Sequence, residues 1–178
     1  MNPMQMRALS LALLLSVAWA FILERPLASI AASLTEPAPN LHAISLPVLA
    51  PAHLMRGFRA PLTDYGAGHR GIDLAASDGA VLLAPASGTV SFARQVNYKP
   101  DLTVTTDSGL KFTLEPACSA VPVGTVVSLG EIIGWVCAGA YQPHCSPALC
   151  LHFSARNANG YLSPLYLLGQ LGPSRLVK

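Results

Sequence analysis

Residues 149–156 read Leu-Cys-Leu-His-Phe-Ser-Ala-Arg, a stretch in which apolar and more polar side chains alternate. Successive side chains of a β-strand point to opposite faces of the sheet, so this alternation predicts a strand with one buried face. The apolar face takes Leu149, Leu151, Phe153 and Ala155, and the other face takes Cys150, His152 and Ser154. We therefore expect His152 to point away from the core, either into a metal site or onto a solvated surface.

Short segments of the same kind precede this stretch and are separated by turn signals such as Asp78-Gly79 and Ser87-Gly88. They are rich in Val, Ile, Thr and Phe, which favours strands, and they cover residues 81–85, 88–94, 102–106, 110–115, 125–129 and 132–137. No strong amphipathic helix lies between them. We expect a compact, mainly antiparallel β domain over residues 56–170, with Phe92, Trp135 and Phe153 in its core.

The N-terminal region differs in composition from this domain. Residues 8–23 form an uncharged apolar run after Arg7, shorter than the roughly 20 residues that a membrane-spanning helix needs. This pattern is typical of an export signal, and an uncleaved membrane anchor is the alternative. Residues 1–31 are assigned to this signal or anchor, residues 32–55, rich in Pro and Ala, to a linker, and residues 171–178 to a tail. We expect the domain outside the cytoplasm, secreted or at the cell surface, with membrane contact only through an uncleaved N-terminal segment.

The charge composition excludes one class of partner. The 178 residues include 11 Lys and Arg against 9 Asp and Glu, for a formal net charge of +2. A broad basic surface, which a protein needs to follow a phosphate backbone, cannot be built from this balance. We therefore expect no nucleic-acid binding.

The chain contains four cysteines, an even number in a sequence with an export-type start. Thiols outside the cytoplasm tend to oxidise, so two disulfides are expected. Three pairings are possible. We favour Cys145 with Cys150 and Cys118 with Cys137, because Pro147 helps the short first loop to turn back.

A second segment whose side chains could bind a metal is Gly-His-Arg-Gly-Ile-Asp at residues 68–73. Its glycines argue against a helix, so it is expected to be a loop that enters a strand. Imidazole nitrogen and carboxylate oxygen are zinc ligands, which makes His69 and Asp73 candidates. The alternative is that Asp73 caps a turn while His69 is exposed.

Taken together, these segments resemble the lysostaphin-type zinc metallopeptidases, which cut peptidoglycan cross-bridges. The resemblance spans residues 57–168 and includes Gly-Thr-Val at 88–90, Val-Gly at 123–124 and Ile-Gly at 133–134 between the two histidine segments. It implies a compact antiparallel sheet or open-barrel fold. It also implies that His69, Asp73 and His152 hold one zinc ion, with peptidoglycan peptides as the ligand class.

The sequence departs from the family pattern at both expected catalytic histidines. Cys150 stands in place of one, and Pro116 falls at the place of the other. The resulting Glu-Pro and Cys-Leu-His pattern resembles a divergent, actinobacterial-type branch of exported members. Glu115 is a candidate replacement for the proton-transfer role, and His144 is another.

Cys150 has two alternative roles beside the expected metal. As a thiolate it would complete a Cys-His-His-Asp centre and leave no place for water. Joined to Cys145, it would instead hold the loop that contains His144 near the site.

Two functional readings follow. In the first, the chain is a zinc endopeptidase-like protein of the cell wall, with Glu115 or His144 covering the missing proton transfers. In the second, it is a non-catalytic module that binds peptidoglycan or activates another cell-wall hydrolase. A third hypothesis is that the metal-ligand residues are only a structural remnant, held in place by the disulfides.

Overall fold

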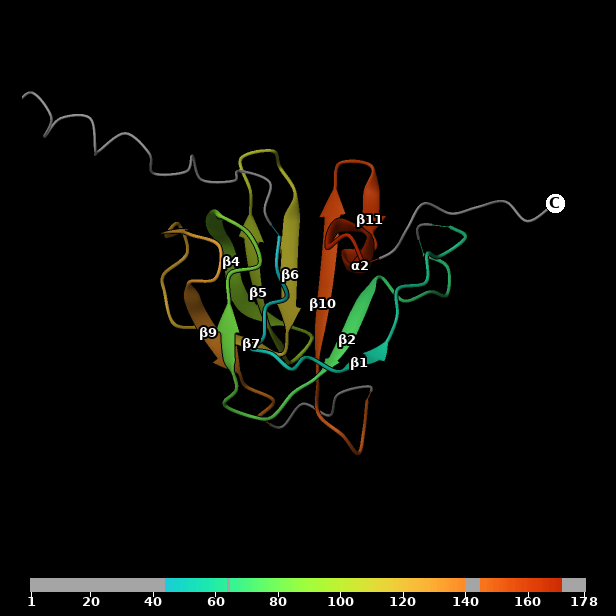
Figure 1. Cartoon of the computed structure of the whole chain (residues 1–178), viewed down its shortest axis with the longest axis horizontal. Coiled ribbons are helices and arrows are strands. Elements are labelled where there is room, and N and C mark those ends of the chain that lie inside the picture. Colours follow the sequence, from blue (N-terminus) through green and yellow to red (C-terminus); the bar gives the residue numbers. More distant parts are fainter. Residues whose placement is uncertain (1–43, 64, 140–144, 171–178) are drawn as a thin grey trace, which may run out of the picture. The chain divides into compact units, whose positions relative to one another are not determined.

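The structure is a computed structural model and describes residues 44–63, 65–139 and 145–170. The regular secondary structure of this part of the chain consists almost entirely of β-strands (Figure 1). The strands are β1 (Leu54–Arg56), β2 (Gly71–Ala75), β3 (Val81–Leu83), β4 (Gly88–Val96), β5 (Lys99–Thr105), β6 (Lys111–Glu115), β7 (Ala117–Ser119), β8 (Val126–Val127), β9 (Ile132–Val136), β10 (Cys150–Asn157) and β11 (Gly160–Leu162). A single helical turn, α2 (Pro164–Leu167), follows β11.

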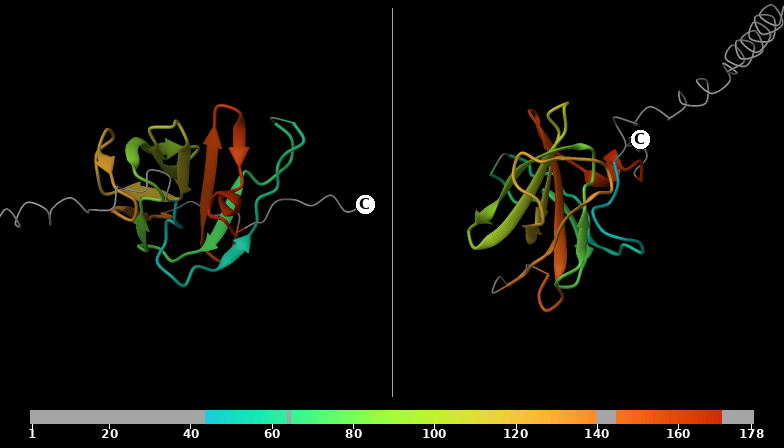
Figure 2. Two further views of the ribbon diagram at one scale, coloured as in Figure 1. Left: turned by 45° about the horizontal axis from the view of Figure 1, so that its top comes forward. Right: turned by 90° about the vertical axis from the view of Figure 1, so that its left-hand side faces the viewer.

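The strands form two antiparallel sheets. The larger has eight strands in the order β1-β2-β10-β6-β5-β4-β8, with β11 also paired to β10. The smaller has three strands in the order β3-β9-β7. Figure 2 shows the large sheet from two further sides. The predicted mainly antiparallel β fold is confirmed.

The core contains the apolar face of β10 and of its neighbours. Leu151, Phe153 and Ala155 are completely shielded from solvent, as the alternation predicts. Phe153 stacks on Phe112 of β6 with ring centroids 5.7 Å apart. Burying a side chain of this size stabilises the fold by about 1.5–3 kcal/mol. The same alternation leaves His152 on the opposite face of the sheet, where it is half-buried.

The packed region begins before residue 56, the predicted boundary. Ile44, Leu46 and Val48 pack against the core. Their segment is also tied by backbone hydrogen bonds, in which Ser45 donates to Pro85 and Leu83 donates to Pro47, each at 2.9 Å. Every second residue here is apolar, which is enough to cover one edge of the core. Part of the expected linker is therefore packed on the domain, whereas residues 1–43 and 171–178 lie outside the described residues.

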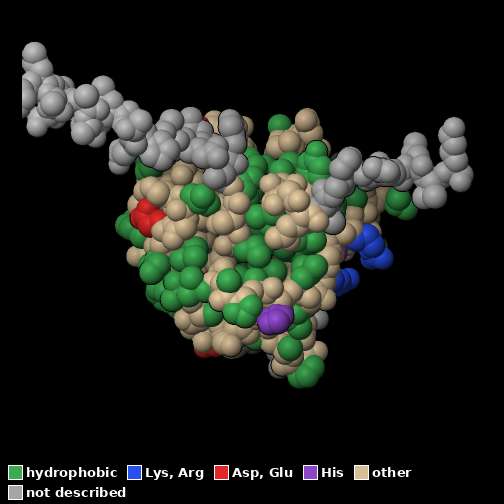
Figure 3. Space-filling model, in the orientation of Figure 1, with side chains coloured by type: hydrophobic (Ala, Val, Ile, Leu, Met, Phe, Trp, Pro, Cys, Tyr) green, Lys and Arg blue, Asp and Glu red, His purple; other side chains and the backbone are tan. Residues whose placement is uncertain are grey.

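The prediction that Trp135 is a core residue is wrong. Its side chain is 43% exposed, because it shares the outer face of the small sheet with Val81, its partner on β3. Phe92 is only half-buried. The face of the molecule in Figure 3 shows many hydrophobic side chains and few charged ones. No helix among residues 44–63, 65–139 and 145–170 is long and apolar enough to span a membrane.

Both disulfides have the favoured pairing. Cys118 of β7 is bonded to Cys137, directly after β9, so this bond ties two strands of the small sheet. Cys145 is bonded to Cys150 at the start of β10. The second bond closes a short loop next to the strand that carries His152.

Candidate metal centre

Two neighbouring strands position the metal-ligand candidates. Asp73 of β2 is directly opposite His152 of β10 in the antiparallel register, so the two side chains share one face of the sheet. His69 lies two residues before β2. Its backbone exchanges hydrogen bonds with Arg59, at 2.7 and 2.9 Å, and these bonds fix the loop where it enters the strand.

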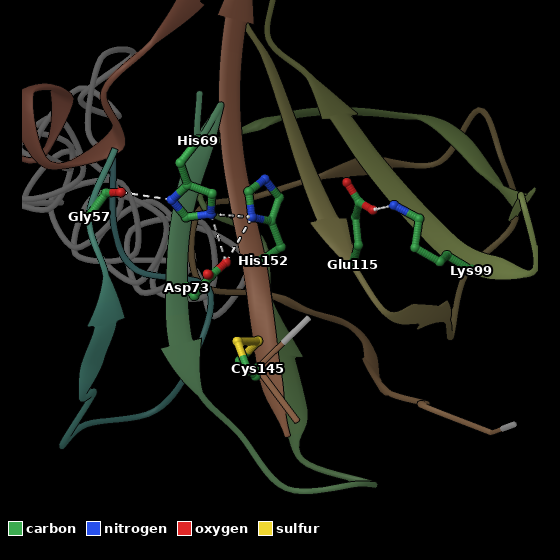
Figure 4. Close-up of polar contacts among 8 residues, drawn as sticks. Gly57, His69, Asp73, Lys99, Glu115, Cys145 and His152 are labelled. Carbon is green, nitrogen blue, oxygen red and sulfur yellow. Dashed lines mark hydrogen bonds and ion pairs between the residues drawn. A yellow bond between two sulfur atoms is a disulfide. The ribbon is translucent and has the colours of Figure 1, made fainter. Parts of the chain in front are cut away.

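The three candidates each place one nitrogen or oxygen atom close to those of the other two (Figure 4). His152 Nδ1 lies 2.8 Å from Asp73 Oδ1. His69 Nε2 lies 3.1 Å from the same oxygen and 3.2 Å from His152 Nδ1. The structure therefore brings together all three residues that the sequence analysis selected as metal ligands.

The dimensions of this triangle fit a zinc ion. Zinc binds nitrogen and oxygen at about 2.0–2.2 Å in tetrahedral geometry, which separates its ligands by about 3.3–3.5 Å. The observed edges of 2.8–3.2 Å need to open by roughly 0.1–0.7 Å, most of all between His152 and Asp73. Asp73 is completely buried and His69 is 6% exposed, so the site is shielded on the protein side. Three protein ligands leave a fourth coordination position, as in hydrolytic zinc sites.

A hydrogen bond orients the His69 ring. Its Nδ1 lies 2.7 Å from the carbonyl oxygen of Gly57. Because a carbonyl only accepts, Nδ1 carries a proton, and in the neutral ring the lone pair of Nε2 therefore faces Asp73 and His152. Carbonyl partners of this kind fix the tautomer of metal-binding histidines.

Gly71 leaves the space that the His152 ring occupies. A Cβ atom at this position would lie 2.7 Å from His152 Nε2 and 2.4 Å from the Phe153 carbonyl oxygen. Real Cβ atoms do not approach other atoms so closely. The glycine between His69 and Asp73 is therefore required by close packing of β2 on β10.

The Cys145–Cys150 disulfide lies beside the metal-ligand candidates. Each sulfur is within 4.8 Å of a carboxylate oxygen of Asp73. In the bonded state Cys150 is not a thiolate, so the structure has the disulfide alternative rather than the Cys-His-His-Asp centre. His144, a candidate for the proton-transfer role, lies outside the described residues.

Glu115 lies on the other side of His152. It is the residue of β6 directly opposite His152, and its carboxylate is ion-paired with Lys99 of β5. Figure 4 shows Glu115 and Lys99 across β10 from Asp73. Asp73, His152 and Glu115 thus form one row across three adjacent strands. Pro116 follows Glu115 and ends the strand, so no imidazole stands in this position.

The sequence analysis missed Asp101, an acidic neighbour of this row. Asp101 of β5 lies one residue beyond the Leu102–Leu114 pair, which places it next to Glu115, and it is 9% exposed. Burial, and then the Glu115 charge, raise the pKa of its carboxyl from 3.8 to about 6, against the opposing charges of Lys99 and His152. Its Oδ1 has no hydrogen-bond partner among the described residues. The alternation in residues 99–105 indicates a strand that contains Asp101, but only the pairing of β5 with β6 shows that Asp101 lies next to Glu115.

The chain matches the sequence model of peptidase family M23 over residues 67–164. It is 36% identical over 126 residues to the uncharacterized proteins Rv2891 of Mycobacterium tuberculosis and Mb2915 of Mycobacterium bovis. These alignments cover 68% of this chain and 50% of each relative. The chain thus spans about half the length of the curated relatives it matches.

Solved structures share the fold at low sequence identity. The antimicrobial peptidase lysostaphin from Staphylococcus simulans is 24% identical with a TM-score of 0.58, covering 75% of this chain and 57% of that chain. A zinc-containing peptidase from Vibrio cholerae is 23% identical with a TM-score of 0.58, covering 69% and 39%. The SpoIIQ–SpoIIIAH pore-forming complex gives 19% identity and a TM-score of 0.59, covering 72% and 92%.

The family match extends over more than half of the chain and includes both segments that supply the metal-ligand candidates. The antiparallel fold of the solved relatives agrees with the two sheets described above. The chain therefore belongs to peptidase family M23, the family of the lysostaphin-like peptidases.

Proposed function

We propose that this chain is an exported, zinc-binding M23 domain that acts on peptidoglycan peptides at the cell wall. One observation carries the proposal: His69 Nε2, Asp73 Oδ1 and His152 Nδ1 lie 2.8–3.2 Å from one another. Membership of a peptidase family supports a peptide as the ligand. The apolar run at residues 8–23 supports export.

Hydrolysis of a peptide bond is the first candidate activity. Zinc, when bound, supplies a Lewis acid that polarises a carbonyl and activates water. Glu115, in the same row as His152, would accept the proton of the attacking water and return it to the leaving amine. Its ion pair with Lys99 holds the carboxylate on this face of the sheet.

A binding module is the second candidate, and the state of Cys150 favours it. This residue replaces a catalytic histidine of the family pattern, and its sulfur is bonded to Cys145 and cannot exchange a proton. In this role the same face would hold peptidoglycan peptides without cutting them, or would recruit or activate another cell-wall hydrolase. His144 then has no catalytic task.

Metal analysis tests the zinc site that both candidates share. We expect about one zinc ion per purified chain, lost in His69→Ala and in His152→Ala. His53→Ala is the matched control, because it removes an exposed imidazole just before β1 and should leave the zinc in place. Full metal loading of His69→Ala would contradict the assignment.

Digestion of purified wall fragments separates the two candidates. Hydrolysis creates new amino termini, detected by mass, and these should disappear in Asp73→Ala and fall about 10²- to 10⁴-fold in Glu115→Gln. A decrease on metal removal and recovery on adding zinc completes the test. Fragments that bind the chain but stay intact would support the module and exclude the endopeptidase.

The proposal also assigns roles to the two ends of the chain. Residues 1–31 would direct export or anchor the chain, and the tail at residues 171–178 would take no part in the site. The mature protein should be recovered outside the cytoplasm after cell fractionation. Recovery in the cytoplasmic fraction, with residues 1–31 intact, would contradict this part of the proposal.

A further inference from the structure

Another row of side chains crosses the large sheet near the far end of β10. Arg156 of β10 is directly opposite Lys111 of β6. Tyr161 of β11 is opposite Arg156, and Thr105 of β5 is opposite Lys111. Side chains of directly opposed residues share a face, and side chains two residues apart on a strand also share one. The row therefore lies on the same face as His152.

The two cations in this row are placed side by side. Lys111 and Arg156 are both exposed, and neither has an ion-pair partner within the described part of the chain. Like charges directly opposite each other on adjacent strands destabilise a sheet. An anion bound between them relieves this repulsion, so the pair is arranged to favour an anionic ligand.

A hollow extends from this cationic pair as far as Glu115, the cross-strand neighbour of His152. Its volume is ≈ 480 Å³, and its lining includes Lys111 and Arg156 together with Glu115 and Asp101. Ser154, Thr113 and Thr103 lie between the two ends and supply hydroxyl groups. Four residues of β10 separate His152 from Arg156, which corresponds to about 13 Å along a strand.

The charges in this hollow are divided between its ends. Glu115 and Asp101 lie near the metal centre, and Lys111 and Arg156 lie at the other end. The ion pair with Lys99 offsets part of the negative charge at the first end, whereas the two cations at the second end attract a carboxylate. An extended peptide would therefore be held in one direction along the hollow.

We propose that Lys111 and Arg156 form a carboxylate-binding subsite for the peptide held in this hollow, an inference that rests on the proposed function above. The guanidinium of Arg156 offers a planar fork that matches a carboxylate, and Lys111 adds a point charge. The ligand is a peptide whose free carboxylate lies about 13 Å, or about four extended residues, from the carbonyl at the metal centre. Acidic stem peptides of peptidoglycan belong to this chemical class.

Calorimetry with a matched pair of probes tests the subsite. The probes are soluble peptidoglycan stem peptides, used either with their free carboxylates or after conversion of those carboxylates to amides. The full zinc-loaded chain carries Glu115→Gln so that the fragments stay intact. We expect the carboxylate form to bind at least about tenfold more tightly, since hydrogen bonds between charged groups are strong. The combined Lys111→Gln and Arg156→Gln variant should lose this preference.

Arg94→Gln is the control, because Arg94 is an exposed cation of β4 that does not line this hollow. It should keep the preference for the carboxylate form. Equal affinity for the two forms, or a preference that survives the double substitution, overturns the subsite while leaving the proposed function intact. If neither form binds the zinc-loaded chain, the proposed function itself is contradicted.

Discussion

Asp73 and His152, 79 residues apart in the sequence, are direct cross-strand partners on β2 and β10, with Asp73 Oδ1 2.8 Å from His152 Nδ1. The cluster of metal-ligand candidates is therefore a product of strand register. A slip of one residue would turn His152 into the core and move Leu151 or Phe153 onto the metal face. Burial of Phe153 and Leu151 thus stabilises the arrangement that keeps the ligands together.

Gly71→Ala tests this dependence on close strand packing. The added Cβ would meet the Phe153 carbonyl oxygen at 2.4 Å and His152 Nε2 at 2.7 Å, so β2 and β10 must separate. We expect the free energy of unfolding to fall by about 1–3 kcal/mol, as for other overpacked sites, and zinc binding to weaken. Gly57→Ala is the matched control, since nothing lies within 4 Å of its Cβ position and the substitution keeps the backbone carbonyl that orients His69. Unchanged stability in Gly71→Ala, measured by urea unfolding, would contradict this packing.

The pH dependence of stability tests the environment of Asp101. Its carboxyl has a pKa of about 6 in the folded chain against 3.8 ordinarily, so the folded state binds more protons between these values. The contribution of Asp101 to stability should therefore decrease as pH rises from about 4 to 6, by linkage. Glu115, Lys99, His152 and Arg94, which is opposite on β4, are the charged groups around it.

Asp101→Asn removes this titration. The comparison uses metal-free wild type and variant, so that the other groups cancel in the difference. We expect the variant to gain stability relative to wild type as pH rises from 4 to 7, measured by urea unfolding. A difference that stays constant over this range would show that Asp101 is not desolvated.

Lys111→Gln should stabilise the free protein. It removes the repulsion with Arg156 across β6 and β10, an effect of about 0.2–1 kcal/mol for directly opposed charges. Thermal unfolding at low salt gives the largest difference, because salt screens exposed charges. A loss of stability would mean that Lys111 makes a stabilising contact in the folded protein, and would contradict the repulsion between Lys111 and Arg156.

Much of this site is predictable from local patterns. The alternation at residues 149–156 predicts β10 and the outward side of His152, and the glycines of residues 66–71 predict the loop before Asp73. Both follow from local backbone geometry. The favoured disulfides also agree with the structure. The Cys145–Cys150 pair could be predicted because the two cysteines are close in the sequence, and the Cys118–Cys137 pair then uses the remaining two.

Features that depend on long-range register are absent from these patterns. Asp101 becomes a neighbour of Glu115 only through the pairing of β5 with β6, and Lys111 meets Arg156 only through the pairing of β6 with β10. The exposure of Trp135 depends on which face of the small sheet is covered. The packing of Ile44 was missed because the alternation at residues 44–48 is too short, within a Pro-rich segment, to predict a packed strand.

Cys145→Ala tests whether Cys150, once freed from the disulfide, can bind the metal as a thiolate. The substitution leaves Cys150 as a thiol near Asp73, where both groups are within 4.8 Å in the bonded state. Cobalt loaded in place of zinc reports such a ligand through thiolate-to-cobalt charge-transfer absorption. We expect this absorption in Cys145→Ala but not in the wild type, with Ser77→Ala as a control away from the site. Its presence in the wild type would mean that the disulfide is open.

X-ray absorption spectroscopy of the zinc-loaded wild type tests the central claim most directly. We expect one zinc per chain, surrounded by two imidazoles and additional oxygen at about 2.0–2.2 Å, with no sulfur at about 2.3 Å. His152→Ala should remove one imidazole or the metal itself. A wild-type chain that takes up no zinc, or whose zinc is bound by sulfur, would contradict the centre formed by His69, Asp73 and His152.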